Sequence, residues 1–253
     1  MRYDFQRASM LKRVPAWILD AILLITLAVG IMAGVSRVLD VEAHTAALNA
    51  IYVRYEQEYN VDFAKAREEF AEMTEEELAR YEAAAEALSK DTDAQKAYEL
   101  VLNLTLITLS IGTLVSFLIF EFLIPLLLKN GQTIGKKVFG VALMRKDGVK
   151  VTPFMMFART ILGKYTLETM IPILLVVAVI FGVMGLEGLI LMLIGLLAPV
   201  ITMFATRNKT AFHDMLACTV AVDLSSQMIF DTPEAQLEYH KQLHAEMVEK
   251  TEY

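Results

Sequence analysis

The chain has 253 residues, of which 56% are hydrophobic and 21% charged, and its mean hydropathy is +0.47. Such a composition is unusual for a soluble domain and favours a membrane protein in which apolar and charged residues occupy separate segments. A single cysteine, Cys218, excludes an internal disulfide and a zinc site built from several thiolates. The net charge of −7 argues against a nucleic-acid partner.

Three apolar stretches, 14–36, 100–128 and about 166–205, are each long enough to cross a bilayer. The third, as one helix, would measure about 60 Å, roughly twice the hydrocarbon thickness. We expect it to turn at residues 182–188, where three glycines and Glu187 interrupt the apolar run. A cleaved signal peptide is the alternative for the first stretch, but its apolar run exceeds the usual signal core of about 7–15 residues and Asp20 interrupts it. The sequence therefore predicts an all-α membrane protein with four transmembrane helices.

Basic residues gather on one predicted side of the membrane. They are Arg2, Arg7, Lys12 and Arg13 before the first helix, eight Lys and Arg residues within 129–165, and Arg207 and Lys209 after the fourth helix. Because basic loops face the cytoplasm, both termini are predicted to be cytoplasmic in a multi-pass protein, and a bacterial cell membrane is the expected location. Three helices would place Arg207 and Lys209 outside, so the charges also favour four.

The segment 37–99 carries sixteen acidic and seven basic residues and is predicted to be external. It has no Pro or Gly and is rich in Ala, Glu and Leu, which predicts an acidic helical hairpin. Thr74 to Glu77 has the pattern of a capping box, and Asp93 is predicted to cap the second membrane helix. A solvated acidic face is favoured over the alternative, a substrate-gathering or partner-binding surface displaying Tyr52, Tyr55 and Tyr59.

These features divide the chain into six segments. They are 1–36 (cytoplasmic N-terminus and first helix), 37–99 (external hairpin), 100–128 (second helix), 129–165 (basic cytoplasmic segment with an interfacial helix), 166–205 (third and fourth helices) and 206–253 (cytoplasmic His-Asp motif and acidic tail).

Four stretches that lie far apart in the sequence together form one motif pattern. They are Arg13 with Asp20 two helical turns deeper, Gly131-Gln132-Thr133-Ile134-Gly135-Lys136-Lys137, Arg159, and His213-Asp214-Met215-Leu216-Ala217-Cys218-Thr219. In this order they resemble the RDD family, which is named for one arginine and two aspartates. The resemblance implies that Arg13, Asp20 and Asp214 are the motif residues, and that the chain belongs to a group suspected of transporting unidentified ligands. Cys218 stands where many members carry glycine, and the segment 37–99 is an insertion.

Two carboxylates lie at similar predicted depth. Asp20 is about 10 Å along the helix axis from Arg13, and Glu121 is about 12 Å from Lys129. If the two helices are neighbours, Asp20 and Glu121 face each other and can share a proton, which makes them candidate ion- or proton-binding residues with Arg13 as gate or counter-ion. The alternative is that Arg13 pairs with Asp20, and that Glu121 meets another basic residue or a hydroxyl, as fixed struts between helices.

His213 and Asp214 follow the fourth predicted helix at the cytoplasmic interface. His213 is a candidate proton relay, but a hydrogen bond that docks one helix on another is the favoured interpretation. Two adjacent residues with no further ligand nearby do not predict a metal site. No cofactor loop is visible either, because the spacing of Gly131 to Lys137 does not fit a phosphate-binding loop.

The remaining cytoplasmic segments have simpler interpretations. Residues 138–143 and 149–152 predict a short β-hairpin or an excursion into the membrane interface, with Asp147-Gly148 as the turn. Pro153 then begins an interfacial amphipathic helix with Arg159 and Lys164 on its polar face. These bases suit anionic lipid headgroups, although setting the topology explains them as well. Residues 234–249 predict a helix that is exposed or binds a partner.

The leading functional hypothesis is a small transporter that couples the movement of an ion or solute to protons. Four helices enclose little volume, so we expect a homo-oligomer within the lipid bilayer. The alternative is a membrane scaffold or sensor that binds partner proteins through the external hairpin and the cytoplasmic tail. No paired nucleophile and base is visible, so we do not expect an enzyme.

Overall fold

The computed structural model describes residues 6–68, 73–128, 130–180, 182–206 and 210–251. Arg2, Lys129, Arg207 and Lys209, which belong to the predicted basic clusters, lie outside the described residues. The chain forms two compact units, which are described separately. The larger unit is Met1–Ala28 with Thr113–Tyr253, and the smaller unit is Val29–Gly112.

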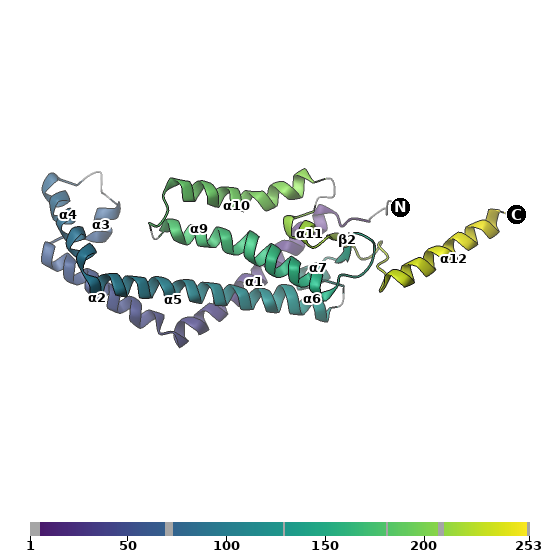
Figure 1. Cartoon of the computed structure of the whole chain (residues 1–253), viewed down its shortest axis with the longest axis horizontal. Coiled ribbons are helices and arrows are strands. Elements are labelled where there is room, and N and C mark those ends of the chain that lie inside the picture. Colours follow the sequence, from purple (N-terminus) through teal and green to yellow (C-terminus); the bar gives the residue numbers. More distant parts are fainter. Residues whose placement is uncertain (1–5, 69–72, 129, 181, 207–209, 252–253) are drawn as a thin grey trace. The chain divides into compact units, whose positions relative to one another are not determined.

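Long apolar helices form most of the larger unit, and two of them, α1 and α5, continue into the smaller one (Figure 1). They are α1 (Met10–Val38); a second helix made of α5 (Thr92–Phe117), η2 (Leu118–Leu123) and α6 (Ile124–Leu127); a third made of α8 (Pro153–Phe157), η3 (Ala158–Met170) and α9 (Ile171–Ile180); and α10 (Leu186–Ala205). The segments η2 and η3 are π-helical, so each backbone N–H bonds to the carbonyl five residues earlier. α10 packs against α9.

Three of these helices are long and apolar enough to cross a membrane: Met10–Val38, Thr92–Leu127 and Pro153–Ile180. The third begins at Pro153, ahead of the predicted start at residue 166, so the segment predicted as an interfacial helix is its first part. Arg159 and Lys164 can enter this helix because both form ion pairs inside the protein. α9 ends at Ile180 and α10 begins at Leu186, which confirms the predicted turn between them.

A two-stranded sheet lies among the helices. Its first strand overlaps the predicted hairpin segment 138–143, but its pairing with a strand after α10 was not predicted. β1 (Val141–Arg145) pairs antiparallel with β2 (Thr219–Asp223), with Val141 opposite Asp223. Residues of β1 alternate between two small apolar clusters, one containing Val141 and Leu143 and the other Ala142 and Met144, as the pleat of a strand requires. The predicted turn at Asp147-Gly148 is present, since Gly148 has φ of +90° and Met144 bridges to Lys150. The fold is therefore helical apart from this sheet within the described residues.

The N-terminal segment joins the same sheet. Arg7 forms an isolated bridge with Val222, and the backbone N–H of Asp223 donates to the carbonyl of Gln6 at 2.9 Å. At the start of α1, Lys12 Nζ lies 2.6 Å from Asp223 Oδ2. Three segments far apart in the sequence thus meet at β2: the N-terminus, the connection between the second and third long helices, and the chain after α10.

The smaller unit contains α2 (Val41–Tyr59), α3 (Phe63–Glu68) and α4 (Glu75–Lys90), with the adjoining parts of α1 and α5. α2 packs against α4. The predicted capping box is confirmed, since the Thr74 side chain accepts from the Glu77 N–H and Glu77 accepts from the Thr74 N–H. The cap of α5 is Asp91 instead of Asp93, because Asp91 precedes the first turn and its Oδ1 accepts from the N–H groups of Asp93 and Ala94.

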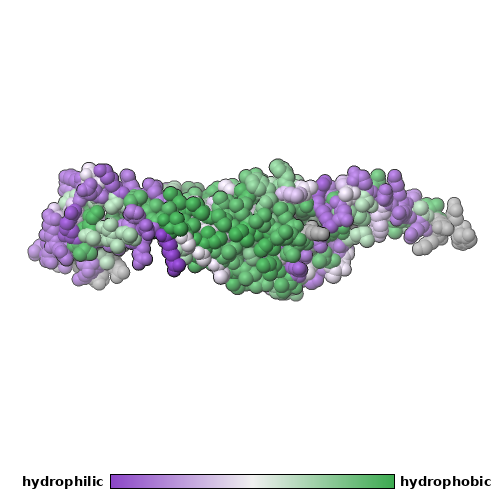
Figure 2. Space-filling model, turned by 90° about the horizontal axis from the view of Figure 1, so that it is seen from below, coloured by the Kyte–Doolittle hydropathy of each residue, from purple (hydrophilic) through white to green (hydrophobic). Residues whose placement is uncertain are grey.

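Short helices complete the fold: α7 (Ile134–Val138), α11 (Phe212–Leu216) and the longer α12 (Pro233–Thr251), which confirms the helix predicted near the C-terminus. Figure 2 shows hydrophobic residues covering the long helices, whereas hydrophilic residues gather over α2 to α4 and over α12. α12 is anchored at its start by Gln236, whose Nε2 donates to the carbonyl of Asp147 at 2.7 Å.

Candidate functional site

Asp20 is buried where α1 meets the start of α7, with 5% of its surface exposed. One carboxylate oxygen accepts from the Thr133 hydroxyl, and the other accepts from the Gly135 N–H at 2.7 Å. α7 approaches α1 so closely that a Cβ at Gly135 would lie 2.3 Å from the carbonyl oxygen of Ala16. Glycine is therefore needed at position 135, and the Gly131–Lys137 motif serves to bind the first motif aspartate.

Lys136 joins the contact between α1 and α7 through Thr133. Its Nζ donates to the Thr133 hydroxyl oxygen at 3.3 Å, and its side chain is partly buried. Burial and the neighbouring positive charge of Lys164 lower the pKa of Lys136 to about 7, although the negative charge of Glu121 acts to raise it. The adjacent Lys137 is exposed.

Arg159 on η3 joins the second long helix to the second motif aspartate. Its Nε donates to Asp214 Oδ1 at 2.8 Å, and its Nη1 lies 3.8 Å from Glu121 Oε2. All three side chains are at most 4% exposed. Burial acts to raise the pKa of the Asp214 carboxyl, but the charges of Arg159 and His213 hold it well below its usual range. Arg159 therefore sits between two ionised carboxylates.

Glu121 on η2 has a second cation beside it. Its Oε1 accepts from Lys164 Nζ at 2.5 Å, whereas neither Glu121 Oε2 nor Arg159 Nη1 has a hydrogen-bond partner among the described residues. The Thr160 hydroxyl donates to the backbone carbonyl of Glu121 at 2.9 Å and ties η2 to η3. A buried acceptor without a hydrogen bond is unfavourable by about 1–3 kcal/mol, and Glu121 Oε2 is such an acceptor within the described residues.

His213 on α11 is docked against η3 by Glu168. The backbone N–H of His213 donates to Glu168 Oε1 at 3.0 Å, and Nδ1 lies 2.7 Å from Glu168 Oε2. The close approach requires Gly163, where a Cβ would lie 2.6 Å from His213 Cβ. Burial lowers the pKa of the imidazole, although the charge of Asp214 acts to raise it. The helix-docking hydrogen bond expected of His213 is thus present, whereas its role as a proton relay stays a prediction.

The described contacts do not join Arg13 to Asp20. The Arg13 guanidinium is attracted by the charge of Asp214 and repelled by that of Arg159. Asp20 instead binds Thr133 and Gly135. Nor do the described contacts join Asp20 to Glu121, whose carboxylate binds Lys164. The predicted residues therefore share one buried network, but with partners that differ from those expected.

The network holds equal numbers of opposite charges among the described residues. Its carboxylates are Asp20, Glu121, Glu168 and Asp214, and its basic side chains are Arg13, Lys136, Arg159 and Lys164, with His213 between Glu168 and Asp214. Such compensation is what allows several charges to stay ionised away from water.

Several members were not singled out from the sequence. Glu168 carried a signal, since it is a lone carboxylate inside an apolar run. Lys136 and Lys164 carried none beyond membership of a basic segment, because their inward orientation depends on how α7 and η3 pack. No group of three or more His, Cys, Asp and Glu side chains within the described residues is arranged to hold a metal ion.

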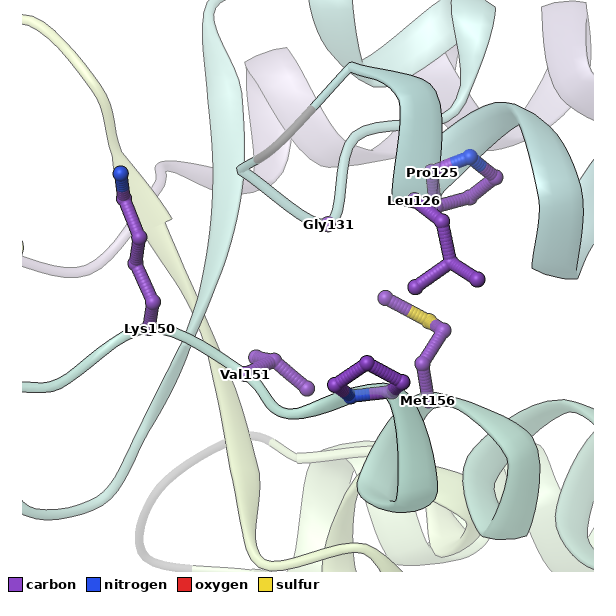
Figure 3. Close-up of a pocket in the computed structure, with 7 residues that line it drawn as sticks. Pro125, Leu126, Gly131, Lys150, Val151 and Met156 are labelled. Carbon is purple, nitrogen blue, oxygen red and sulfur yellow. The ribbon is translucent and has the colours of Figure 1, made fainter. Parts of the chain in front are cut away.

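A cavity of about 280 Å³ lies near this network, between the end of α6 and the start of α8. Figure 3 shows Leu126, Val151 and Met156 pointing toward one another around it, with Lys150 on the opposite side. Lys150 Nζ pairs with Asp231. The cavity is mainly apolar and does not contain the network carboxylates.

Comparison with known proteins identifies one family. The sequence profile of the RDD family matches residues 7–218, which cover the network from Arg13 to Asp214. No curated protein and no solved structure matches the chain. Because the match extends over far more than half of the sequence, the chain belongs to the RDD family.

Proposed function

We propose that this RDD-family protein is a small membrane transporter that couples movement of an ion or solute to protons. The observation that carries the proposal is the position of Glu121 between two competing cations, Lys164 at 2.5 Å and Arg159 at 3.8 Å, with one carboxylate oxygen unbonded. A carboxylate with an open acceptor position can take up a proton or a cation while the surrounding bases change partners.

The helix geometry around Glu121 supports a functional role. Glu121 lies on π-helical η2, and Arg159, Lys164 and Glu168 lie on π-helical η3. π-helical turns are rare and are frequently found at functional sites, because they widen the helix and redirect side chains. In this proposal, Glu121 and Asp20 bind the transported cation or proton, and the basic side chains are their counter-ions.

The proposal includes four transmembrane helices with both termini on the cytoplasmic side. The pairing of β1 with β2 supports it, because β1 precedes the long helix that runs from α8 to α9, and β2 follows α10. Strands that pair must lie on one side of the membrane, so if Pro153–Ile180 crosses it, α10 has to cross back. The N-terminal bridge from Arg7 to Val222 supports the same placement of the N-terminus. The basic segments then face the cytoplasm.

The assembly in the membrane is part of the proposal. Four helices enclose little volume, and many large apolar side chains of α10 are exposed, among them Leu189, Leu193 and Leu197. We propose a homo-oligomer in which such faces meet lipid or another copy. Lys137 and Lys146 are exposed on the basic segment and are the residues proposed to meet anionic lipid headgroups.

A scaffold or sensor is the second candidate, and a specific observation favours it. Within the described residues the network is charge-balanced and buried, as expected of fixed struts. α12 and the acidic helices α2 and α4 are largely exposed and would bind partner proteins.

Ion flux in proteoliposomes separates the two candidates. Purified full-length protein would be reconstituted with an internal pH dye, and Na⁺, K⁺ or Li⁺ added outside, for wild type, Glu121→Gln and Asp20→Asn. We expect cation-dependent proton movement in wild type that is lost in both variants. Glu187→Gln, which changes an exposed carboxylate in the first turn of α10, is the matched control and should retain it.

Each variant must first elute as one species of wild-type size, so that loss of flux is not loss of folding. Proton movement that survives in Glu121→Gln would contradict the role of that carboxylate. Absence of movement with any cation, in wild type that is correctly folded, would contradict proton–cation exchange and favour the scaffold.

A further inference from the structure

Asp20 and Lys136 differ from the rest of the network in their partners. Glu121, Asp214 and Glu168 each face a basic side chain directly, namely Lys164, Arg159 and His213. Asp20, in contrast, binds only a hydroxyl and a backbone N–H, and Lys136 binds only a hydroxyl, among the described residues.

The same hydroxyl serves both residues. Thr133 Oγ1 donates its proton to Asp20 Oδ2 and accepts from Lys136 Nζ at 3.3 Å. A threonine hydroxyl has one donor and two acceptor positions, so both bonds can form at once. The three side chains therefore form a continuous hydrogen-bonded line from an ammonium to a buried carboxylate.

The line leads from a partly exposed residue into the protein interior. Lys136 is partly exposed, whereas Thr133 is fully buried and Asp20 is 5% exposed. The Gly135 N–H holds the other oxygen of Asp20 at 2.7 Å, so the carboxylate is fixed with Oδ2 toward Thr133. Lys137, next in sequence, is exposed and does not enter this line.

We propose that Lys136, Thr133 and Asp20 form a proton relay in which Lys136 exchanges protons with water and Asp20 is the inner acceptor. In the transfer, an Nζ–H bond of Lys136 breaks and that proton binds Thr133 Oγ1, whose own proton passes to Asp20 Oδ2. The products are a neutral amine and a neutral carboxylic acid, so no other reactant is needed. In the proposed transporter, this relay is the path that the proton follows. Its biological role therefore rests on the proposed function.

The surrounding charges favour this exchange. Lys136 is acted on by Asp20 from α1, Glu121 from η2, Arg159 and Lys164 from η3, and Asp214 from α11. Burial and the two bases disfavour the ammonium, and the three carboxylates favour it, which leaves the pKa of Lys136 at about 7. A lysine with that pKa gains and loses its proton near neutral pH, whereas an ordinary lysine, with a pKa of about 10.4, does not.

The first test measures titration and needs no transport. Full-length protein in detergent is treated with a limiting amount of an amine-acylating reagent over a range of pH, and the modification of each lysine is quantified by peptide mass spectrometry. We expect Lys136 to become reactive around pH 7, whereas a lysine with an ordinary pKa of about 10.4 becomes reactive about three pH units higher. Lys136 titrating together with Lys137 would overturn the relay, and this comparison uses wild type alone.

The second test follows the inner carboxyl by infrared spectroscopy. The carboxylic acid band is assigned to Asp20 by its absence in Asp20→Asn, and we expect it to titrate with the same midpoint as Lys136, because one proton is shared between them. Lys136→Arg retains the positive charge but cannot release a proton, so the band near pH 7 should disappear. Lys137→Arg is the matched control and should leave it unchanged.

Variants of the bridging residue complete the design. Thr133→Val removes the hydroxyl at nearly constant volume and should shift the band away from the Lys136 midpoint, whereas Thr133→Ser should keep the two together. A band that titrates identically in wild type and Lys136→Arg would overturn the relay. If Lys136 and the Asp20 band share a midpoint in a protein that shows no ion flux, the relay is supported and the transporter is contradicted. The two proposals can therefore be contradicted independently.

Discussion

Arg159 Nε and Asp214 Oδ1 lie 2.8 Å apart, although the residues are separated by 55 positions in the sequence. Each side chain is at most 4% exposed. Asp214 also accepts from the Thr219 hydroxyl at 3.1 Å, so the pair links η3 to α11 and to the start of β2. The motif residues therefore have a structural task in addition to any role in transport.

Arg159→Met should destabilise the protein strongly. It leaves Asp214 buried without the arginine that binds it and Glu121 with Lys164 alone, and removing one partner of a buried ion pair typically costs about 3–5 kcal/mol. The free energy of unfolding can be measured by titration with a denaturing detergent. Arg145→Met is the matched control, because its partner Asp147 and Arg145 itself are both partly exposed, and it should cost no more than about 1 kcal/mol.

The double variant Arg159→Met with Asp214→Leu should recover part of that loss, since neither charge is then left unpaired. A loss for Arg159→Met no larger than that for Arg145→Met would contradict the buried pair.

Gly135→Ala should weaken the contact between α1 and α7. The added Cβ would lie 2.3 Å from the backbone oxygen of Ala16 and 2.8 Å from Asp20 Oδ1, so the helices have to separate and the Asp20 hydrogen bonds lengthen. We expect a loss of about 1–3 kcal/mol in the free energy of unfolding. Gly30→Ala, where nothing lies within 4 Å of the added carbon, is the control and should be neutral or slightly stabilising. Equal effects of the two changes would contradict the packing at Gly135.

Much of the helical framework could be predicted from the sequence. The turn between α9 and α10 follows from three glycines and Glu187 in an apolar run, and the Thr74–Glu77 capping box follows from local residue spacing. Such features depend on neighbouring residues. The pairing of β1 with β2 could not be predicted in the same way, because the two strands are short and lie far apart in the chain.

The partners within the network were predicted less well than its members. The predicted depth of Glu121 assumed a regular helix with a rise of 1.5 Å per residue, but Glu121 lies on π-helical η2, where the residues are redirected around the axis. Asp20 was expected to meet Arg13 or Glu121, and instead binds Thr133 and Gly135. Those bonds depend on how closely α7 approaches α1, which spacing along the sequence does not determine.

Acid should weaken the contact between α1 and β2. The Lys12 ammonium and the Ser225 hydroxyl lower the pKa of Asp223 to about 2, below the value of about 3.9 expected in an unfolded chain. Between these values the unfolded chain binds a proton that the folded protein does not. The stabilisation is therefore complete above about pH 4 and is lost as the pH falls to about 2.

The measurement is the unfolding midpoint in detergent as a function of pH. Asp223→Asn should lose the part of the acid sensitivity that falls between about pH 4 and pH 2. Asp231→Asn is the matched control, since Asp231 is a mostly exposed carboxylate paired with Lys150, and it should behave as wild type. Unchanged acid sensitivity in Asp223→Asn would show that the Lys12–Asp223 pair does not stabilise the fold.

Accessibility to a membrane-impermeant thiol reagent should follow the four-span topology. In a Cys218→Ala background, single cysteines would be placed at the exposed positions Ala83 on α4, Val183 between α9 and α10, and Ser226 after β2. We expect Ala83→Cys and Val183→Cys to be labelled in intact cells, and Ser226→Cys to be labelled only after the cells are opened, because the proposed topology places the basic segments and the paired strands β1 and β2 on the cytoplasmic side. Labelling of Ser226→Cys in intact cells would place β2 outside. Since β1 pairs with β2, that result would also move the connection between the second and third long helices, and would reverse the orientation of the whole larger unit.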